Sequence, residues 1–214
     1  MAKLVKVQRP KFIDDLEEIE DIYDEVIYEE KIQNKIIEDR EIVEKNDVGI
    51  TIDSCVFKNV VFEDCDFTRI DLLDSRFENC DLSNVSFSGG GLHRVEFVNC
   101  KLMGANFSEC SIKDATFQNV MGGYATFSFS KIKNVNFIES NLKEAVFQEV
   151  KLDKVVFEEC DLTNGYFNKT FLGKQDLTSC DIEGIDVEIE NIYGTTVTAM
   201  QGLDLTRLMG LIIK

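Results

Sequence analysis

The sequence is poor in the residues from which enzyme sites and metal sites are built. It has one histidine, and none of its seven cysteines forms a Cys-x-x-Cys pair. His93 directly follows a large apolar residue of the repeat described below and should point to solvent. A single exposed imidazole gives neither a nucleophile-base pair nor a histidine metal site. We therefore expect no enzyme, with no catalytic residue, no metal and no cofactor.

Long apolar runs are also missing. No stretch approaches the roughly 18 apolar residues of a membrane span, and the first dozen residues lead into an acid-rich segment where a signal peptide needs an apolar one. Seven cysteines is an odd number, which excludes a fully paired disulfide framework. These features predict a cytoplasmic protein.

Basic residues are few relative to acidic ones. The 214 residues include 40 Asp or Glu and 23 Lys or Arg, which gives a formal charge of -17 and a pI near 4.4. Such a chain does not bind a phosphate backbone unaided. Its field favours basic partners, although solubility alone also explains an acidic surface. The 44% hydrophobic fraction is enough for a sizeable core.

A five-residue repeat organises most of the chain. Every fifth residue from Ile52 to Ile192 is large and apolar, with Gly122 as the exception. Residues five apart are rotated by about 140° in a helix, and an odd step changes the face of a strand. A chain that turns once per five residues satisfies the pattern, which predicts a solenoid. At Gly122 we expect a cavity, a kink or Tyr124 filling the gap.

The residues two before each large apolar position are mostly small, and they include all seven cysteines. This placement indicates that the cysteines are small filler in a narrow core rather than metal ligands or nucleophiles.

Two further periods give the size of one coil. Phe occupies every tenth position from Phe57 to Phe167, which implies an even number of sides. Basic residues recur every 19 to 21 positions, at Arg94, Lys113, Lys133, Lys154 and Lys174. Both fit a four-sided coil of 20 residues. About seven coils then run from residue 50 to 192, in a rod about 34 Å long.

The repeat resembles the pentapeptide-repeat family. Its motif of a small residue, a polar residue, Leu or Phe and two polar residues is seen in Cys80-Asp81-Leu82-Ser83-Asn84 and Ala105-Asn106-Phe107-Ser108-Glu109. The resemblance implies an all-β solenoid, namely a right-handed quadrilateral β-helix, for residues 50–192. It is specific for fold and says less about function.

Residues 193–214 predict a short helix and an apolar tail. Thr198 is a candidate N-cap and Gly210 stands where a helix ends. The segment resembles the C-terminal segment of Qnr-type quinolone-resistance proteins, through Val197, Gln201 and the Met209-Gly210-Leu211-Ile212-Ile213 finish. The resemblance implies a two-fold homodimer, while a helix that only caps its own coil is the alternative. The expected dimerisation residues are Val197, Leu205, Leu208, Met209, Leu211 and Ile212.

Residues 1–49 predict an acidic N-terminal cap, with 15 acidic and 8 basic residues. Apolar residues between Ile13 and Ile27 fit one face of a helix, and Ile32, Ile37 and Ile42 keep the five-residue phase. We expect a short helix followed by one or two degenerate coils.

Placing the charges on four sides shows an uneven distribution. Three sides are net negative, and the fourth, centred on Leu72, Leu92 and Ile112, is nearly neutral. The second side, centred on Phe62, Leu82 and Leu102, is the most acidic. Its candidate partner-binding residues are Glu63, Asp64, Asp81, Glu144, Asp161, Asp181 and Glu183.

Rows of carboxylates on a rod offer a DNA-binding protein a surface like that of DNA. The Qnr-like resemblance implies DNA gyrase, and with it topoisomerase IV, as the target of a non-enzymatic DNA mimic that inhibits the enzyme or protects it from quinolones. The chain has no room for the projecting loops of many Qnr-type proteins. The alternative is a structural adaptor that presents an acidic face to an unrelated protein.

Overall fold

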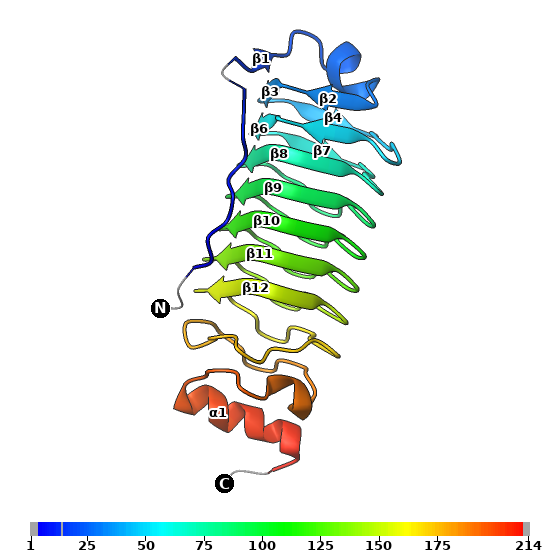
Figure 1. The fold of residues 1–214 in the computed structure, drawn as a ribbon. Helices are drawn as coiled ribbons and strands as arrows, with labels where there is room; N and C mark the ends of the chain where they lie inside the picture. Colours follow the sequence, from blue (N-terminus) through cyan, green and yellow to red (C-terminus); the bar gives the residue numbers. More distant parts are fainter. Residues whose placement is uncertain (1–3, 14, 212–214) are drawn as a thin grey trace.

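The computed structural model describes residues 4–13 and 15–211, which form a rod of stacked coils with a helix across its C-terminal end (Figure 1). The strands are β1 (Glu17–Glu18), β2 (Lys31–Gln33), β3 (Lys35–Glu38), β4 (Glu41–Val43), β5 (Thr51–Asp53), β6 (Val56–Lys58), β7 (Val61–Glu63), β8 (Asp71–Glu78), β9 (Gly91–Val98), β10 (Ser111–Gln118), β11 (Lys131–Ile138) and β12 (Lys151–Glu158). The helical elements are the π-helical turn η1 (Tyr23–Ile27), the 3-10 helices η2 (Ile189–Ile192) and η3 (Thr206–Met209), and α1 (Ala199–Leu205).

From β2 onward, neighbouring coils pair in parallel with a constant offset of 20 residues. Phe57 pairs with Phe77, Phe77 with Phe97 and Phe117 with Phe137. Between the longer strands the same offset continues as single bridges, such as Asp161 with Asp181. The predicted β-solenoid of about seven coils is therefore confirmed.

The corners of the coil explain the five-residue period. At each corner one residue has a positive φ, as at Asn59 (52°), Asn79 (55°), Asn99 (55°) and Asn119 (51°). Asn and Asp tolerate this left-handed conformation better than other residues with a β-carbon. The four asparagines also join neighbouring coils, because each Nδ2 of Asn79, Asn99 and Asn119 donates to the Oδ1 of the asparagine 20 residues earlier.

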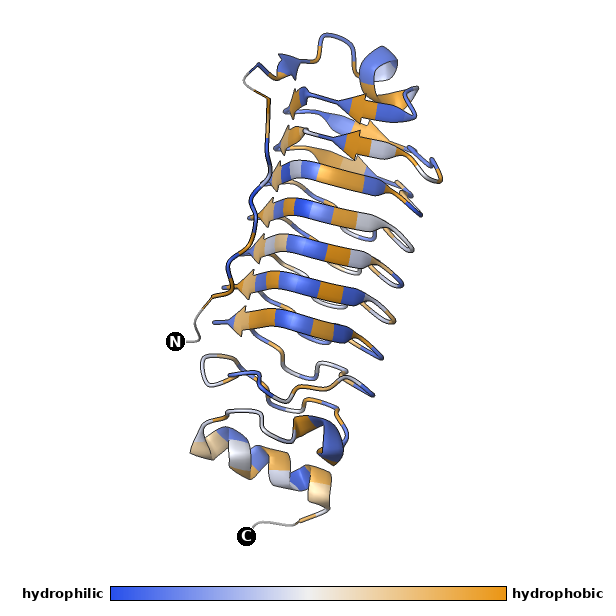
Figure 2. Cartoon of the chain, viewed as in Figure 1, coloured by the Kyte–Doolittle hydropathy of each residue, from blue (hydrophilic) through white to orange (hydrophobic). Residues whose placement is uncertain are grey.

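Two columns of phenylalanine fill the core. In one column, from Phe57 to Phe157, rings 20 residues apart stack with centroids 4.7 to 5.0 Å apart. The other column includes Phe107 and Phe127, whose rings stack at 5.0 Å, and it meets the first edge to face. Ring stacking at the strand spacing lets every coil bury the same residue at the same place. In Figure 2 this regularity appears as hydrophobic bands aligned across β8 to β12.

The cysteines occupy the small inward positions, as predicted, and all seven are buried. Burial raises the pKa of Cys55 to about 11 and that of Cys110 to about 12, so neither thiol ionises at neutral pH. Ser130 and Ser140 take equivalent positions and donate to the carbonyls of Phe107 and Ile138.

Two local expectations differ from the structure. Tyr124 does not fill the gap at Gly122, since its side chain is 58% exposed. Instead Leu142 of the next coil leans in, with its Cδ2 3.0 Å from where a β-carbon of Gly122 would lie. His93 is half-buried rather than fully solvated, because Arg94 and Asp114 lie beside its ring.

The N-terminal cap is less helical than expected. Among residues 4–13 and 15–49, only Tyr23–Ile27 forms a helical turn, and Val26 of this turn is fully buried over the first coil. Lys35, which replaces a small residue, is neutralised by Glu25 at 2.7 Å and Glu17 at 2.9 Å. Lys45 reaches upward and donates to the carbonyls of Ile27 and Glu29. These polar contacts satisfy residues that the repeat pattern marks as misfits.

Residues 4–13 are extended and lie lengthwise along the outside of the coils, beside the ends of β8 to β11 (Figure 1). We call this segment the strap. The sequence pattern gave no sign of it, since nothing in residues 4–13 follows the five-residue phase.

At the C-terminal end, α1 covers the last coil. Thr198 is its N-cap and forms a capping box with Gln201, and Gly210 (φ 71°) ends η3, both as predicted. Gln201 Nε2 also donates to the carbonyls of Leu177 (2.9 Å) and Cys180 (2.7 Å), which fixes the helix to the coil. No helix within the described residues is long and apolar enough to cross a membrane.

Candidate protein-binding surface

The seven acidic residues predicted on the second side do not form one continuous row. The ladder that contains Asp81 continues through Lys101, Met121 and Asn141 before it reaches Asp161. The acidic residues therefore fall into two groups, whose nearest members, Asp81 and Glu144, lie on coils three steps or about 14 Å apart at the strand spacing. The upper acidic cluster is Glu63, Asp64 and Asp81. The lower acidic cluster is Glu144, Asp161, Asp181 and Glu183.

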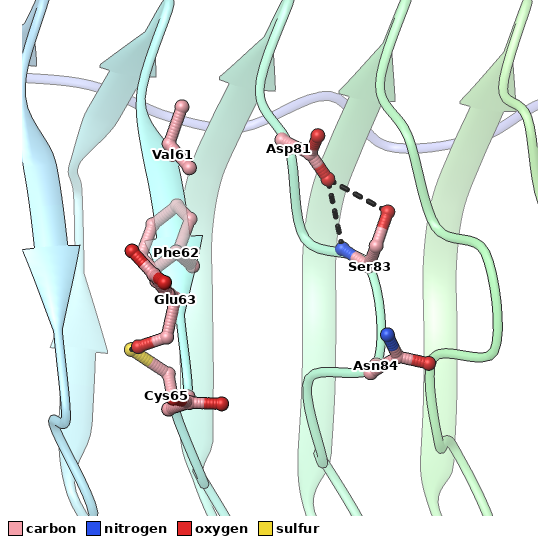
Figure 3. A pocket seen from close by; sticks show the side chains of 8 residues that line it. Val61, Phe62, Glu63, Cys65, Asp81, Ser83 and Asn84 are labelled. Carbon is pink, nitrogen blue, oxygen red and sulfur yellow. Dashed lines mark hydrogen bonds between the residues drawn. The ribbon is translucent and has the colours of Figure 1, made fainter.

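The upper acidic cluster lines a shallow hollow of about 270 Å³ (Figure 3). Asp81 accepts hydrogen bonds from the N–H of Ser83 (3.1 Å) and its Oγ (2.7 Å), and it pairs with Lys101 Nζ at 3.0 Å. Burial by itself would raise the pKa of Asp81, but the bonds from Ser83 and Lys101 outweigh it and lower that pKa. Asp81 is thus a fixed carboxylate, whereas Glu63 and Asp64 are exposed.

The lower acidic cluster adjoins the C-terminal helix. Asp181 and Glu183 are exposed and line a hollow of about 420 Å³ together with Met200 and Gln201 of α1. Asp161 accepts from the N–H of Thr163 at 2.9 Å. Tyr124 OH donates to Glu144 at 3.2 Å, and this bond raises the pKa of Tyr124. Both clusters thus contain exposed carboxylates and carboxylates held by their own turns.

Between the two clusters lies an apolar surface that the sequence analysis missed. Met103, Met121 and Tyr124 are 38%, 53% and 58% exposed. We call these three residues the methionine platform. Met103 rests over Gly123, where a β-carbon would meet its sulfur at 3.3 Å. The sequence did contain a sign of this surface at Gly122-Gly123, the one break in the repeat. Two neighbouring residues without side chains leave the side chains around them exposed.

The first side, centred on Phe57, Phe77 and Phe97, offers less negative charge than the sequence suggested. Glu158 is buried, and Glu96 pairs with Arg76 at 3.1 Å. Arg9 of the strap adds a second cation 4.0 Å from Glu96. The second side receives no such cover from the strap and remains the more accessible acidic surface.

The predicted dimerisation residues separate into two groups. Val197, Leu205 and Leu208 are partly buried and pack against the chain's own core. Met209 and Leu211 are exposed at 63% and 54%, and Ile212 lies outside the described residues. The sequence analysis missed two other exposed residues of α1, Met200 (74%) and Leu203 (51%). The segment therefore caps the coil with one face and leaves an apolar face uncovered.

No group of three or more His, Cys, Asp or Glu side chains within residues 4–13 and 15–211 is arranged to hold a metal ion. The seven second-side carboxylates are spread over the surface rather than converging on one point. This arrangement suits contact with a large charged partner, not coordination of an ion.

Comparisons with known proteins agree with the fold. Residues 70–147 match the model of the pentapeptide repeat region, and residues 17–107 match that of the SV2A/B/C luminal domain. The first match identifies residues 70–147 as a pentapeptide repeat region, and the 20-residue register of the coils continues on both sides of that segment. No curated protein matches the chain significantly.

Several solved structures are similar. QnrB1, a plasmid-mediated fluoroquinolone resistance protein, is 22% identical with a TM-score of 0.45, over 86% of this chain and 90% of that one. HetL, a pentapeptide repeat protein involved in heterocyst differentiation regulation from the cyanobacterium Nostoc, is 12% identical with a TM-score of 0.40, over 75% and 86%. A pentapeptide repeat protein from the thylakoid lumen of Arabidopsis thaliana is 16% identical with a TM-score of 0.31, over 58% and 70%. The function of this chain has therefore to be argued from its own surface.

Proposed function

We propose that this chain is a non-enzymatic DNA mimic that binds the DNA-binding surface of a type II topoisomerase, with DNA gyrase as the main target and topoisomerase IV as a second one. The observation that carries the proposal is the pair of acidic clusters on one side of a regular rod. The Qnr-like C-terminal segment, Val197 to Leu211, supports the choice of enzyme.

Electrostatics supplies the attraction. A surface that receives DNA is positively charged, and complementary charge raises the rate of encounter and sets the orientation of the partner. Because the coil fixes the two clusters in space, their carboxylates reach such a surface with little further ordering. The attraction between exposed charges weakens as salt screens it.

The methionine platform distinguishes this rod from DNA itself. It lies between the acidic clusters, and methionine and tyrosine are enriched in protein interfaces. Burial of its apolar area does not depend on salt, so it supplies a part of the affinity that duplex DNA lacks. The platform thereby favours a protein partner over any basic polymer.

A homodimer through the C-terminal segment is part of the same proposal. The exposed residues Met200, Leu203, Met209 and Leu211 form an apolar end surface next to the lower acidic cluster. Joining two copies there covers this surface and places four acidic clusters on one longer rod. Bound to gyrase, this dimer inhibits supercoiling, or it destabilises the quinolone-trapped cleavage complex and so protects the enzyme.

The test is a supercoiling assay with purified gyrase, with and without a quinolone. Glu63→Lys with Glu183→Lys reverses one exposed charge in each cluster. Asp81 and Asp161 are avoided because they hold their own turns through Ser83 and Thr163. The double variant should lose at least about tenfold in effect.

The matched control reverses two charges on the fourth side, Asp71→Lys with Glu190→Lys, both at exposed carboxylates, and has the same net charge as the test variant. It should act like the unmodified chain. Equal losses in both double variants would show that net charge, not the second side, is responsible. No effect of the unmodified chain on gyrase at micromolar concentration would overturn the proposal.

A structural adaptor is the second candidate. The methionine platform favours it, since an exposed apolar surface suits many protein partners and copies no feature of the DNA backbone. An adaptor that presents the acidic face predicts binding to an unrelated protein that depends on Met103 and Met121 as well as on salt, with no effect on supercoiling.

A further inference from the structure

The strap is held on the outside of the coil by a regular set of contacts. The N–H of Lys11 donates to Asp74 at 2.8 Å, that of Gln8 to Asp114 at 3.3 Å and that of Val5 to Asn136 at 3.0 Å. Asn136 Nδ2 also donates back to the carbonyl of Val5 at 3.0 Å. Every third main-chain N–H of the strap thus finds an acceptor on the coil.

The spacing of these contacts follows from two simple lengths. Asp74 and Asp114 lie two coils apart, which is about 9.6 Å along the axis of the rod. The three residues from Gln8 to Lys11 span a similar length, about 10 Å, in an extended chain. Between Gln8 and Lys11 the extended strap therefore matches the rise of two coils, whereas Asn136, the partner of Val5, lies about one coil beyond Asp114. We call the outer corner between the fourth and first sides, which carries Asp74, Glu96, Asp114 and Asn136, the corner groove.

Charge in the strap and the corner groove is complementary. Lys6, Arg9 and Lys11 are exposed on the strap, which has no acidic residue, and Val5 and Val7 turn partly inward. The groove presents the buried carboxylates of Asp74 and Asp114, and Glu96 lies 4.0 Å from Arg9. The occupant seen here is thus an extended basic segment with alternate small apolar residues.

The strap is attached in a way that allows exchange. Its hydrogen bonds to the coil come mainly from main-chain groups, which any extended segment possesses. Its residues Leu4, Phe12 and Ile13 remain exposed, so little apolar area holds it in place. When the strap leaves, Asp74 and Asp114 regain water rather than staying buried without partners.

We propose that the corner groove is a binding site for an extended basic segment of a partner protein, and that the strap is its built-in competitor. The site lies on a different part of the rod from the acidic clusters and does not depend on the proposed function. As a tethered segment, the strap acts at an effective concentration on the order of millimolar, so the partner segment binds only where it outcompetes it.

The test uses full-length chains and a synthetic peptide of residues 4–13 that is acetylated and carries fluorescein. Gln8→Pro with Lys11→Pro removes two of the three docked N–H groups of the strap, because proline has none, and leaves the coil unchanged. Lys6→Pro with Phe12→Pro is the matched control, since those two N–H groups are not the docked ones. Fluorescence anisotropy measures binding of the peptide.

The Gln8→Pro, Lys11→Pro chain should bind the peptide saturably and at least about tenfold more tightly than the unmodified and control chains. A peptide with Lys6, Arg9 and Lys11 replaced by Glu should not bind. Adding Asp74→Asn and Asp114→Asn to the test chain should weaken binding by roughly tenfold. Absence of saturable binding to a test chain with a native circular dichroism spectrum, or equal binding of the acidic peptide, would overturn the proposal.

A second measurement needs no variant. Unlabelled peptide at millimolar concentration should displace the strap of the isotope-labelled, unmodified chain and speed hydrogen exchange of the Val5, Gln8 and Lys11 amides. Exchange rates of these amides that stay constant across the peptide titration would also contradict the proposal.

Discussion

At the scale of single residues, position within the five-residue repeat decides the environment of a side chain. Phe107 and Phe127 point to the axis and are fully buried, whereas Phe129, at a corner, is 52% exposed. The same residue type thus serves the core or the surface according to a shift of two positions. Phe107 stacks on Phe87 in one neighbouring coil and on Phe127 in the other, so its loss affects three coils.

Replacing Phe107 by Ala should therefore be costly. The variant loses the buried surface of the ring and leaves a cavity in its place. We expect the free energy of unfolding, measured by urea titration, to fall by about 3 to 5 kcal/mol. Phe129→Ala is the matched control and should cost less than about 1 kcal/mol. Similar losses for the two variants would show that the stacked columns do not stabilise the coil.

Residue types at inward positions were predictable, and those at corners and on the surface less so. The phase of the apolar residues and cysteines gives burial directly, because each must reach the axis. The half-burial of His93 was missed, since it depends on Arg94 and Asp114, which no local pattern brings together. The methionine platform was missed because Met103 and Met121 lie at polar positions that the repeat leaves free.

At the scale of elements, the two ends and the strap complete the coil. The turn Tyr23–Ile27 covers one end and α1 covers the other. Lys45 of the coil donates to the carbonyl of Ile27 in the turn, and Gln201 of α1 donates to the carbonyl of Leu177 in the coil. The C-terminal helix was predictable because its cap residues Thr198 and Gly210 act locally. The strap was not, since its contacts join residues such as Val5 and Asn136 that are far apart in the sequence.

Docking of the strap should depend on acid pH through Asp74. Burial by itself would raise the pKa of Asp74, but the hydrogen bonds from Arg94 and from the N–H of Lys11 outweigh it and lower that pKa. The contribution of Asp74 to docking is therefore complete above its ordinary pKa of about 3.9 and is lost as pH falls through the lowered value.

An NMR titration of the Lys11 amide from pH 6 to pH 2 tests this. The amide resonance should stay constant to about pH 4 and move below it. The same titration of Asp74→Asn, which has no charge to lose, should show no such step. A transition of the unmodified chain centred well above pH 4 would be inconsistent with a lowered pKa.

At the scale of the whole molecule, a charge of -17 is distributed over a rod with distinct surfaces. The second side carries two acidic clusters and the methionine platform, the corner groove is covered by a basic strap, and the C-terminal end is apolar. Counting charged residues on each side predicted the second side as the most acidic one. It gave neither the separation of the two acidic clusters nor the strap that covers the corner groove, because both depend on contacts between residues that are far apart in the sequence.

The apolar end predicts a dimer. Light scattering should give about twice the chain mass of 24.4 kDa. Met209→Lys with Leu211→Lys places charge on the exposed face and should give the monomer mass, because an unpaired charge is costly in an apolar contact. Val48→Lys, also at an exposed apolar residue but near the other end, should leave the dimer intact. A monomer for the unmodified chain would refute the dimer and leave α1 as a cap alone.

The central claim is that the second side takes the place of DNA on gyrase. It is tested most directly by measuring the binding of this chain to immobilised gyrase in the presence of increasing duplex DNA. Mutual exclusion is expected, with the apparent Kd rising in proportion to DNA concentration once the DNA site is saturated. Binding that is unaffected by saturating DNA, with the chain, the enzyme and the duplex held in one complex, would contradict it.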